Sequence, residues 1–345
     1  MAPGRIRRVF KRTAVALGAT FGAFLLVAAL VALWPMSTTG LEAAAASPAG
    51  TFDEAVDQFD DWASEETDLG VFEPCRSGLY TTGKPTDVSV VLLHGLTNCP
   101  RQFQEMATEL QADGYNVVVL RAPEHGLADS SGEAIGDVSL VSDLTAQDLI
   151  DWTDASIDIA SGLGGEVRVL GLSMGGIAAA WAAQFRDVDR VVTVAPALAL
   201  ARLPGFVDQP FANFFVRVPP ISIRVAGDLD HSYAGENTRA AAEMLLLGRA
   251  VRDEAATTRP LTGDITVITN DADEQVRNDD IAMLADAWSN RGADVRTFAF
   301  PASLGLVHDI VDAQQPKQQT DVTWPLLIAS LQGQADEQLA IDQTG

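Results

Sequence analysis

Residues 167–176 constrain the fold more than any other stretch of this chain. Their sequence, VRVLGLSMGG, runs from an apolar segment into a glycine-rich corner at Gly171 and Gly175, and an alanine-rich helical stretch follows. A strand that turns directly into a helix forces the corner residue, Ser173, into a sparsely populated backbone conformation. Small neighbours are needed because a Cβ at either glycine would collide with the turn or with the adjacent strand. The sequence therefore predicts a strand–turn–helix unit that exposes Ser173 at its corner.

The spacing of this corner, Gly-x-Ser-x-Gly, is typical of a serine that acts as a nucleophile. The first backbone N–H groups of the following helix point toward any anion that forms beside the hydroxyl of Ser173. The same pattern also arises by chance in ordinary strand-to-helix turns. The rest of the chain must therefore decide between a catalytic and a structural interpretation.

The N-terminal segment predicts a helix that spans a membrane. Residues 14–34 are uncharged and mostly apolar, and they follow five basic residues. Such a helix spans about 30 Å, which matches the hydrocarbon core of a bilayer, and the positive charge places its N-terminus in the cytoplasm. We expect residues 1–36 to be a cytoplasmic tip and an uncleaved signal-anchor in the cell membrane. A signal peptide cleaved near residues 43–46 is the alternative, and it would release the protein.

The remaining chain is predicted to form a linker, one large domain and a tail. Small residues dominate positions 37–50, which we interpret as a tether, and residues 336–345 are expected to fray. Between them, residues 51–335 alternate apolar strand patterns with amphipathic helical ones. We expect strands at 77–82, 88–93, 116–120, 167–172, 191–194, 265–269 and 295–300, and helices at 51–66, 145–160, 176–185, 238–251, 279–290 and 322–331. This alternation predicts an α/β fold with a doubly wound, mostly parallel sheet.

Residues 196–235 interrupt the alternation and are predicted to form a small cap insertion. The segment is rich in proline and in large apolar side chains. The apolar residues are Leu198, Leu200, Leu203, Phe206, Val207, Phe211, Phe214 and Phe215. We expect some of them to face a pocket, and packing of the cap onto the sheet is the alternative.

A serine nucleophile needs a base and a group that orients the base. His308 comes eight residues after the last predicted strand, and it alone of the four histidines fits the chain order serine, acid, histidine. Asp273 follows the strand at 265–269 and is the expected acid, with Asp271 as the alternative. Both positions lie at carboxyl ends of strands, where reactive groups of parallel sheets collect.

The other three histidines are predicted to be structural. His231 falls in the cap insertion and is expected on the surface of the cap. His125 follows the strand at 116–120 near the pocket, where packing is the favoured interpretation. His94 ends the strand at 88–93, where its ring can bond the backbone of a tight turn.

Two backbone N–H groups are also expected at the site, because acyl transfer forms an oxyanion that needs donors. We predict that they belong to Met174, directly after the serine, and to Leu96, in the turn after the strand at 88–93. Cys75 and Cys99 are the only cysteines, and export favours a disulfide between them. That bond would hold the Leu96 turn in place, or it would simply staple a surface segment.

The motifs LLHGLTNCP and GLSMGG, the Asp273 loop and His308 stand in an order and spacing that resemble the α/β-hydrolase fold. The chain is similar to the carboxylesterase and monoacylglycerol-lipase-like members over residues 88–331. The resemblance implies Ser173 as nucleophile, Asp273 as acid and His308 as base, with the N–H groups of Leu96 and Met174 as the oxyanion hole.

The chain departs from the usual pattern of this family at three places. Glu124-His125-Gly126 replaces a Gly-His pair, Asn270 stands where glycine is common, and His308 lacks a preceding glycine. None of these changes removes a group that the resemblance makes catalytic.

We therefore expect a serine hydrolase that cleaves carboxylic esters through an acyl-enzyme, with short to medium acyl chains or monoacylglycerol-like substrates. A peptidase or an acyltransferase could use the same residues, and a catalytically inactive binding module is the remaining alternative. The net charge of −24 opposes binding to nucleic acid. No cofactor is expected, and no metal site, because histidine and cysteine do not cluster at metal-ligand spacing.

Overall fold

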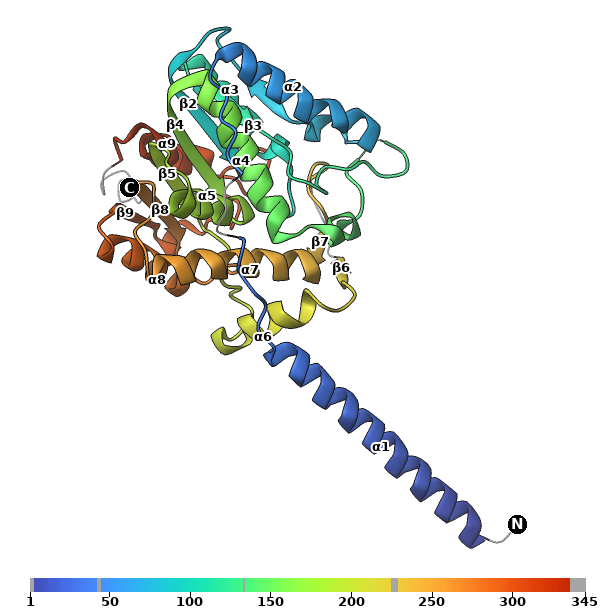
Figure 1. Cartoon of the computed structure of the whole chain (residues 1–345). Helices are drawn as coiled ribbons and strands as arrows, with labels where there is room; N and C mark the ends of the chain where they lie inside the picture. The colour runs from blue at the N-terminus through green and yellow to red at the C-terminus, as the bar shows by residue number, and fades with distance from the viewer. Residues whose placement is uncertain (1–2, 42–44, 133, 225–228, 336–345) are drawn as a thin grey trace.

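The computed structural model describes residues 3–41, 45–132, 134–224 and 229–335, so the expected tail at 336–345 lies outside it. Figure 1 shows one domain of strands and helices from which a long N-terminal helix extends. The strands are β1 (Gly78–Tyr80), β2 (Thr86–Leu93), β3 (Asn116–Val119), β4 (Gly164–Leu172), β5 (Arg190–Val194), β6 (Ser222–Arg224), β7 (Gly235–Asn237), β8 (Asp264–Asn270) and β9 (Asp294–Phe300). The helices are α1 (Pro3–Leu33), α2 (Phe52–Leu69), α3 (Gln104–Ala112), α4 (Ala146–Leu163), α5 (Met174–Phe185), α6 (Gly205–Phe215), α7 (Thr238–Ala255), α8 (Asn278–Asn290) and α9 (Thr320–Gln332). The described residues also form the short 3-10 helices η1 (Glu73–Cys75), η2 (Pro100–Phe103), η3 (Val138–Asp143) and η4 (Ala302–Leu304).

The main sheet has seven strands in the order β1-β3-β2-β4-β5-β8-β9. Every neighbouring pair is parallel except β1 with β3, which is antiparallel. Helices flank the sheet on both faces, with α4 and α5 on one face and α9 on the other (Figure 1). The predicted doubly wound, mostly parallel α/β fold is therefore confirmed.

The central strands are buried because their sequences are continuously apolar, as expected of strands covered on both faces. In β2 the last four residues are at most 1% exposed, and β4 is buried from Val169 to Leu172. Helix α5 consists largely of alanine and glycine, and all its residues from Met174 to Gln184 are buried. Small side chains let this helix lie close to β4 and β5, which it contacts.

Local signals set the ends of the helices that surround the site. Helix α4 begins with the capping box that the sequence predicts, in which Thr145 and Asp148 bond each other's backbone N–H groups. After α3, Gly114 adopts a φ of +95°, which favours glycine and ends the helix before β3 begins.

The segment before α2 differs from the predicted tether. The N–H groups of Ala45 and Ser47 bond the side chains of Asp154 and Asp158 on α4, and the N–H of Ala49 bonds the carbonyl of Asp158. Both carboxylates also pair with Arg186, the residue after α5. Residues 45–49 are therefore hydrogen-bonded along α4, and Ala49 is buried, because buried carboxylates supply acceptors that composition alone does not reveal.

The insertion between β5 and α7 contains α6 and the two-stranded antiparallel ribbon of β6 and β7. Helix α6 packs on α7 and also against the end of α1. Among the described residues, one helix has the length and composition of a membrane span: Val15–Leu33, with a mean hydropathy of 2.4 and no burial. A signal sequence has the same character.

Candidate active site

Ser173 occupies a sharp corner between β4 and α5, at the carboxyl edge of the sheet. Its φ of +60° and ψ of −111° place it in a region that side chains rarely adopt. A Cβ on Gly171 would lie 1.9 Å from the carbonyl oxygen of Gly175, and one on Gly175 would lie 1.9 Å from that of Leu93. Only glycine can therefore stand on either side of this corner, as the sequence predicts.

Backbone hydrogen bonds hold the strained corner in place. The N–H of Ser173 donates to the carbonyl of Val194 at the end of β5, at 3.0 Å. The carbonyl of Ser173 accepts from Ile177 at 3.0 Å and from Ala197 at 3.2 Å. The neighbouring strand and the start of the cap segment thus fix the backbone that carries the hydroxyl.

His308 and Asp273 meet at the carboxyl ends of the next two strands. Nδ1 of His308 lies 2.6 Å from Oδ2 of Asp273, whose side chain is fully buried. Oδ1 of Asp273 accepts the N–H groups of Gln275 and Val276 at 2.8 and 3.2 Å. Burial by itself would raise the pKa of Asp273, but the hydrogen bond and charge of His308 and the two amides hold it below its usual value. The carboxylate is thus ionised and accepts the Nδ1 proton.

The contact with Asp273 uses Nδ1 of His308 and leaves the other ring nitrogen, Nε2, on the opposite side of the ring. In the tautomer with the proton on Nδ1, Nε2 carries a lone pair. Nε2 is buried and has no hydrogen-bond partner among the described residues. The alternative acid, Asp271, is exposed and its N–H bonds the carbonyl of Phe300, so Asp273 is the carboxylate in contact with His308.

Asn270, which replaces the common glycine at the end of β8, supports the loop that carries His308. Its amide nitrogen donates to the carbonyls of Leu306 and Val307, both at 3.1 Å, and its oxygen accepts the N–H of Ala272 at 2.9 Å. Asn270 is 1% exposed. The sequence did not predict this role, although an amide side chain at a strand end, next to the loop of the expected acid, is a signal for it.

The turn that carries Leu96 is held by side chains on both sides. The N–H of Gly95 bonds Oε1 of Gln102 at 2.8 Å, and Nε2 of Gln102 donates to Asp309, the neighbour of His308, at 2.7 Å. The carbonyl of Leu96 lies 2.8 Å from Nε2 of His125. The N–H of Leu96 has no acceptor in the described part of the chain, and the N–H of Met174 is the first of α5, where helical partners are lacking.

His94 and His125 are structural, as predicted. Nε2 of His94 accepts the N–H of Ala122 at 3.1 Å, and its Nδ1 lies 3.0 Å from the carbonyl of Gly95. Burial, followed by the charge of His125, lowers the pKa of His94 well below its usual value. Burial likewise lowers the pKa of His125 to about 4. The carbonyls of Pro123 and Leu96 act in the opposite direction, because their hydrogen bonds favour the charged form of the ring.

His231 is not on the cap surface, and that prediction is wrong. The side chain is fully buried, with Nε2 at 2.8 Å from Oδ2 of the equally buried Asp312 and Nδ1 at 2.9 Å from Asp230. The error arises because Asp312 is 81 residues away and its proximity depends on the tertiary fold. The pair joins the end of the cap to the loop that follows His308.

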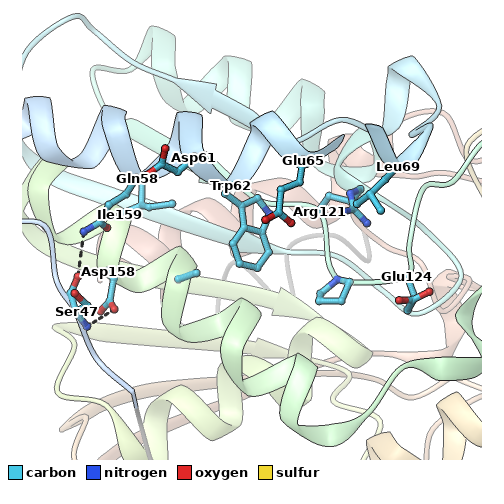
Figure 2. A pocket seen from close by; sticks show the side chains of 12 residues that line it. Ser47, Gln58, Asp61, Trp62, Glu65, Leu69, Arg121, Glu124, Asp158 and Ile159 are labelled. Carbon is cyan, nitrogen blue, oxygen red and sulfur yellow. Dashed lines mark hydrogen bonds between the residues drawn. The ribbon is translucent and has the colours of Figure 1, made fainter. Parts of the chain in front are cut away.

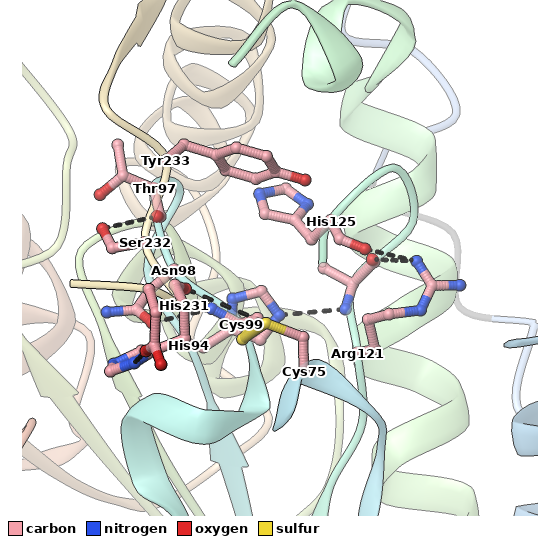
Figure 3. Close-up of a disulfide and its surroundings, with 12 residues drawn as sticks. Cys75, His94, Thr97, Asn98, Cys99, Arg121, His125, His231, Ser232 and Tyr233 are labelled. Atoms are coloured by element: carbon pink, nitrogen blue, oxygen red, sulfur yellow. Dashed lines mark hydrogen bonds and ion pairs between the residues drawn. A yellow bond between two sulfur atoms is a disulfide. The ribbon is translucent and has the colours of Figure 1, made fainter. Parts of the chain in front are cut away.

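Cys75 and Cys99 form a disulfide, which Figure 3 shows beside His94, His125 and His231. The sulfur atoms are 2.06 Å apart and both residues are fully buried. Cys99 directly precedes η2 and follows the Leu96 turn, so the bond ties that turn to η1.

The cavity at the serine holds about 380 Å³ and is lined by Ser173, His308 and Leu96. Its apolar wall comes largely from the cap and α7: Leu200, Leu203, Phe211, Ile223, Ala241 and Met244. Three of the cap side chains that the sequence analysis singled out, Leu200, Leu203 and Phe211, thus face the cavity, whereas Leu198 is buried in the core.

A second cleft of about 640 Å³ lies between α2 and α4, where Figure 2 shows Trp62 among acidic side chains. None of Ser173, Asp273 and His308 lines it, so we place the candidate site in the smaller cavity. Among the described residues, no group of three His, Cys, Asp or Glu side chains is placed to hold a metal ion.

A family model described as the alpha/beta hydrolase family matches residues 90–336. The chain belongs to the alpha/beta hydrolase family. The match spans the Ser173 corner, the cap, Asp273 and His308. Among curated protein sequences, none matches this chain.

Solved structures of lipolytic enzymes share the architecture. The monoacylglycerol lipase of Paleococcus ferrophilus is 17% identical, with a TM-score of 0.57 over 74% of this chain and 98% of that one. A soluble variant of the monoglyceride lipase of Saccharomyces cerevisiae is 14% identical, with a TM-score of 0.56 over 75% and 90%. A structure from the metagenome-derived lipolytic enzymes LipS and LipT is 17% identical, with a TM-score of 0.54 over 76% and 99%. At these identities the likeness establishes the fold alone.

Proposed function

We propose that this alpha/beta hydrolase cleaves carboxylic esters through an acyl-enzyme on Ser173, and that α1 anchors it in a membrane with the domain outside the cytoplasm. The observation that carries the catalytic proposal is the Asp273–His308 pair, whose histidine lines the same cavity as Ser173 and has no partner for Nε2 among the described residues. The disulfide supports an oxidising location for the domain.

In the proposed reaction, Nε2 of His308 takes the proton of Ser173 as Oγ attacks the ester carbonyl carbon. Asp273 holds the imidazole in the required tautomer and stabilises the imidazolium that forms. The N–H groups of Leu96 and Met174 donate to the oxyanion, each contributing about 3 kcal/mol to the transition state. His308 then protonates the leaving alcohol, and a water activated by the same nitrogen releases the acid.

The lining of the cavity supports an apolar acyl group as the substrate. Leu200, Leu203, Phe211 and Met244 provide an apolar wall within about 380 Å³. Each methylene transferred from water into such a wall contributes about 0.8 kcal/mol. Short to medium acyl esters, including monoacylglycerol-like molecules, therefore fit the site better than charged peptides.

A series of p-nitrophenyl esters from acetyl to hexanoyl tests this proposal. We expect kcat/KM to rise with chain length to at least butyryl and to exceed turnover of matched aminoacyl amides by orders of magnitude. Ser173→Ala should abolish both hydrolysis and labelling by a fluorophosphonate. A flat profile or a preference for the amides would favour a peptidase, and no labelling of the wild-type protein would favour a binding module.

A further inference from the structure

The end of α1 is bound directly to the cap. Oδ1 of Asn213 on α6 accepts the N–H of Met36 at 3.2 Å, and its amide nitrogen donates to the carbonyl of Ala32 at 2.9 Å. Asn213 is 2% exposed. The end of the apolar helix α1 is therefore in direct contact with α6, the helix that carries part of the cavity wall.

Arg217, just after α6, completes this contact. Its NH1 donates to the carbonyl of Trp34 at 2.6 Å and to that of Val31 at 3.4 Å, and its NH2 donates to that of Pro35 at 3.1 Å. The last carbonyls of a helix lack partners within the helix and carry the negative end of its dipole. A guanidinium at this place therefore satisfies and neutralises the end of α1.

The contact places the cap at the level where the apolar helix ends. The apolar segment Val15–Leu33 is followed by Trp34, which is 71% exposed, and tryptophan is enriched where a membrane meets water. In Figure 1, α6 and β6 lie on the side of the domain toward which α1 extends, and α2 lies on the far side. If α1 spans a bilayer, α6 and β6 face its surface.

The cap also exposes large apolar side chains. Phe206 is 83% exposed, Ile221 54% and Ile223 52%. Ile223 lies on β6 and lines the catalytic cavity, so the apolar surface continues into the cavity.

The charge of the cap does not oppose contact with lipid. Residues 196–235 contain three arginines, Arg202, Arg217 and Arg224, and three aspartates, Asp208, Asp228 and Asp230. Asp208 is buried against Arg277. Arg202 and Arg224 each pair with one carboxylate, so the cap is close to neutral while the whole chain carries −24.

We propose that the cap is a membrane-docking surface, held by the α1–α6 contact against the outer leaflet of the bilayer that α1 spans. Phe206, Ile221 and Trp34 enter the interfacial layer, and Ile223 marks the point where an amphiphilic ester passes from the leaflet into the cavity. The docking rests on the proposed anchor, and the passage of substrate rests on the proposed ester hydrolysis.

The first test measures the contact without using activity. The native cysteines form a disulfide, so Phe206→Cys introduces a single free thiol that an environment-sensitive NBD label can modify. In the full-length protein in phosphatidylcholine vesicles, we expect blue-shifted emission that spin-labelled lipids quench. The matched control is Met283→Cys on α8, 68% exposed and outside the cap, which should remain water-like. Water-like emission at position 206 would overturn the proposal.

The second test asks whether Arg217 sets the orientation. In Arg217→Ala we expect loss of lipid quenching at position 206 and a several-fold fall in hydrolysis of a vesicle-embedded long-chain ester, with hydrolysis of soluble butyryl ester unchanged. Arg217→Lys, which can still donate to one carbonyl, should recover part of both. Unchanged quenching in Arg217→Ala would refute the proposed role of the contact. Lipid contact without hydrolysis of either ester would instead reject the proposed function.

Discussion

Asp273 illustrates how single residues make the candidate site possible. A buried carboxylate is costly unless it is hydrogen-bonded, and Asp273 accepts bonds from His308 and from two backbone N–H groups. These bonds favour the ionised form of Asp273. The bond from His308 also orients the imidazole, whose Nε2 has no hydrogen-bond partner among the described residues. Ser173 depends in the same way on the two glycines that admit its strained backbone.

The choice between the two aspartates can be tested directly. We predict that Asp273→Asn lowers kcat/KM for a butyryl ester by roughly three to four orders of magnitude, because an amide in that place no longer holds the required tautomer of His308. Asp271→Asn, a matched change at an exposed position two residues away, should stay close to wild type. The opposite ranking would show that Asp271 is the acid.

At the scale of elements, the site depends on bonds between strand ends and loops. Asn270 links the end of β8 to the loop before His308, and Gln102 links the Leu96 turn to Asp309. The proposed catalytic groups thus lie on loops that are hydrogen-bonded to one another, although the loops follow different strands.

We predict that Asn270→Gly, which restores the residue common in the family, impairs catalysis. Without the bonds to Leu306 and Val307, His308 is held less well, and kcat should fall about 10- to 100-fold with little change in KM. Asn278→Ala is the matched control, because it removes a bond to the carbonyl of Asn270 without touching the His308 loop. An equal loss in both variants would indicate a general structural effect.

His125 predicts a pH dependence of stability. Its pKa of about 4 in the fold lies below the value of about 6.5 for an unfolded histidine, so the unfolded chain binds the proton first and acidification destabilises the fold. The contribution is retained above pH 6.5 and lost as the pH falls toward 4, by on the order of 2 kcal/mol between pH 7 and pH 5. Urea unfolding gives the free energy of unfolding of the wild type and of His125→Asn at each pH. We expect the difference between the two free energies to shrink by this amount from pH 7 to pH 5. A constant difference would contradict the buried neutral state.

At the scale of the whole molecule, distant segments converge behind the Leu96 turn. The Cys75–Cys99 disulfide and the His231–Asp312 pair join the segment after α2, the cap and the loop after His308. Helix α6 of the cap also contacts the end of α1, so the cap connects the cavity with the N-terminal helix.

Removing the disulfide should therefore weaken the fold and the site together. Closing a loop with a sequence separation of 24 residues stabilises by about 3 kcal/mol in the chain-entropy estimate. We predict that Cys75→Ala/Cys99→Ala loses stability of this order and loses activity before it unfolds. Native protein without reductant should contain no reactive thiol, and two free thiols in such material would contradict the bond.

The sequence alone determined the features that depend on local sterics, on periodicity or on a small number of partners. The glycines around Ser173 admit one kind of corner, the alternating apolar patterns require a parallel sheet between helices, and two cysteines allow a single pairing. Ser173, His308 and an aspartate of the 271–273 loop could be grouped because the carboxyl ends of parallel strands share one edge of the sheet. The contact of His308 with Asp273 rather than Asp271 became visible only in the structure.

Only the tertiary structure decided which distant polar groups meet. Four contacts join segments that no local pattern relates. They are the buried pair of His231 with Asp312, the bonds of Asn270 to the His308 loop, the hydrogen bonds of residues 45–49 to α4, and the contact of Arg217 with the end of α1. Each is specific because a buried donor or acceptor must find a partner, and the partner it finds depends on which segments the folded core brings within reach.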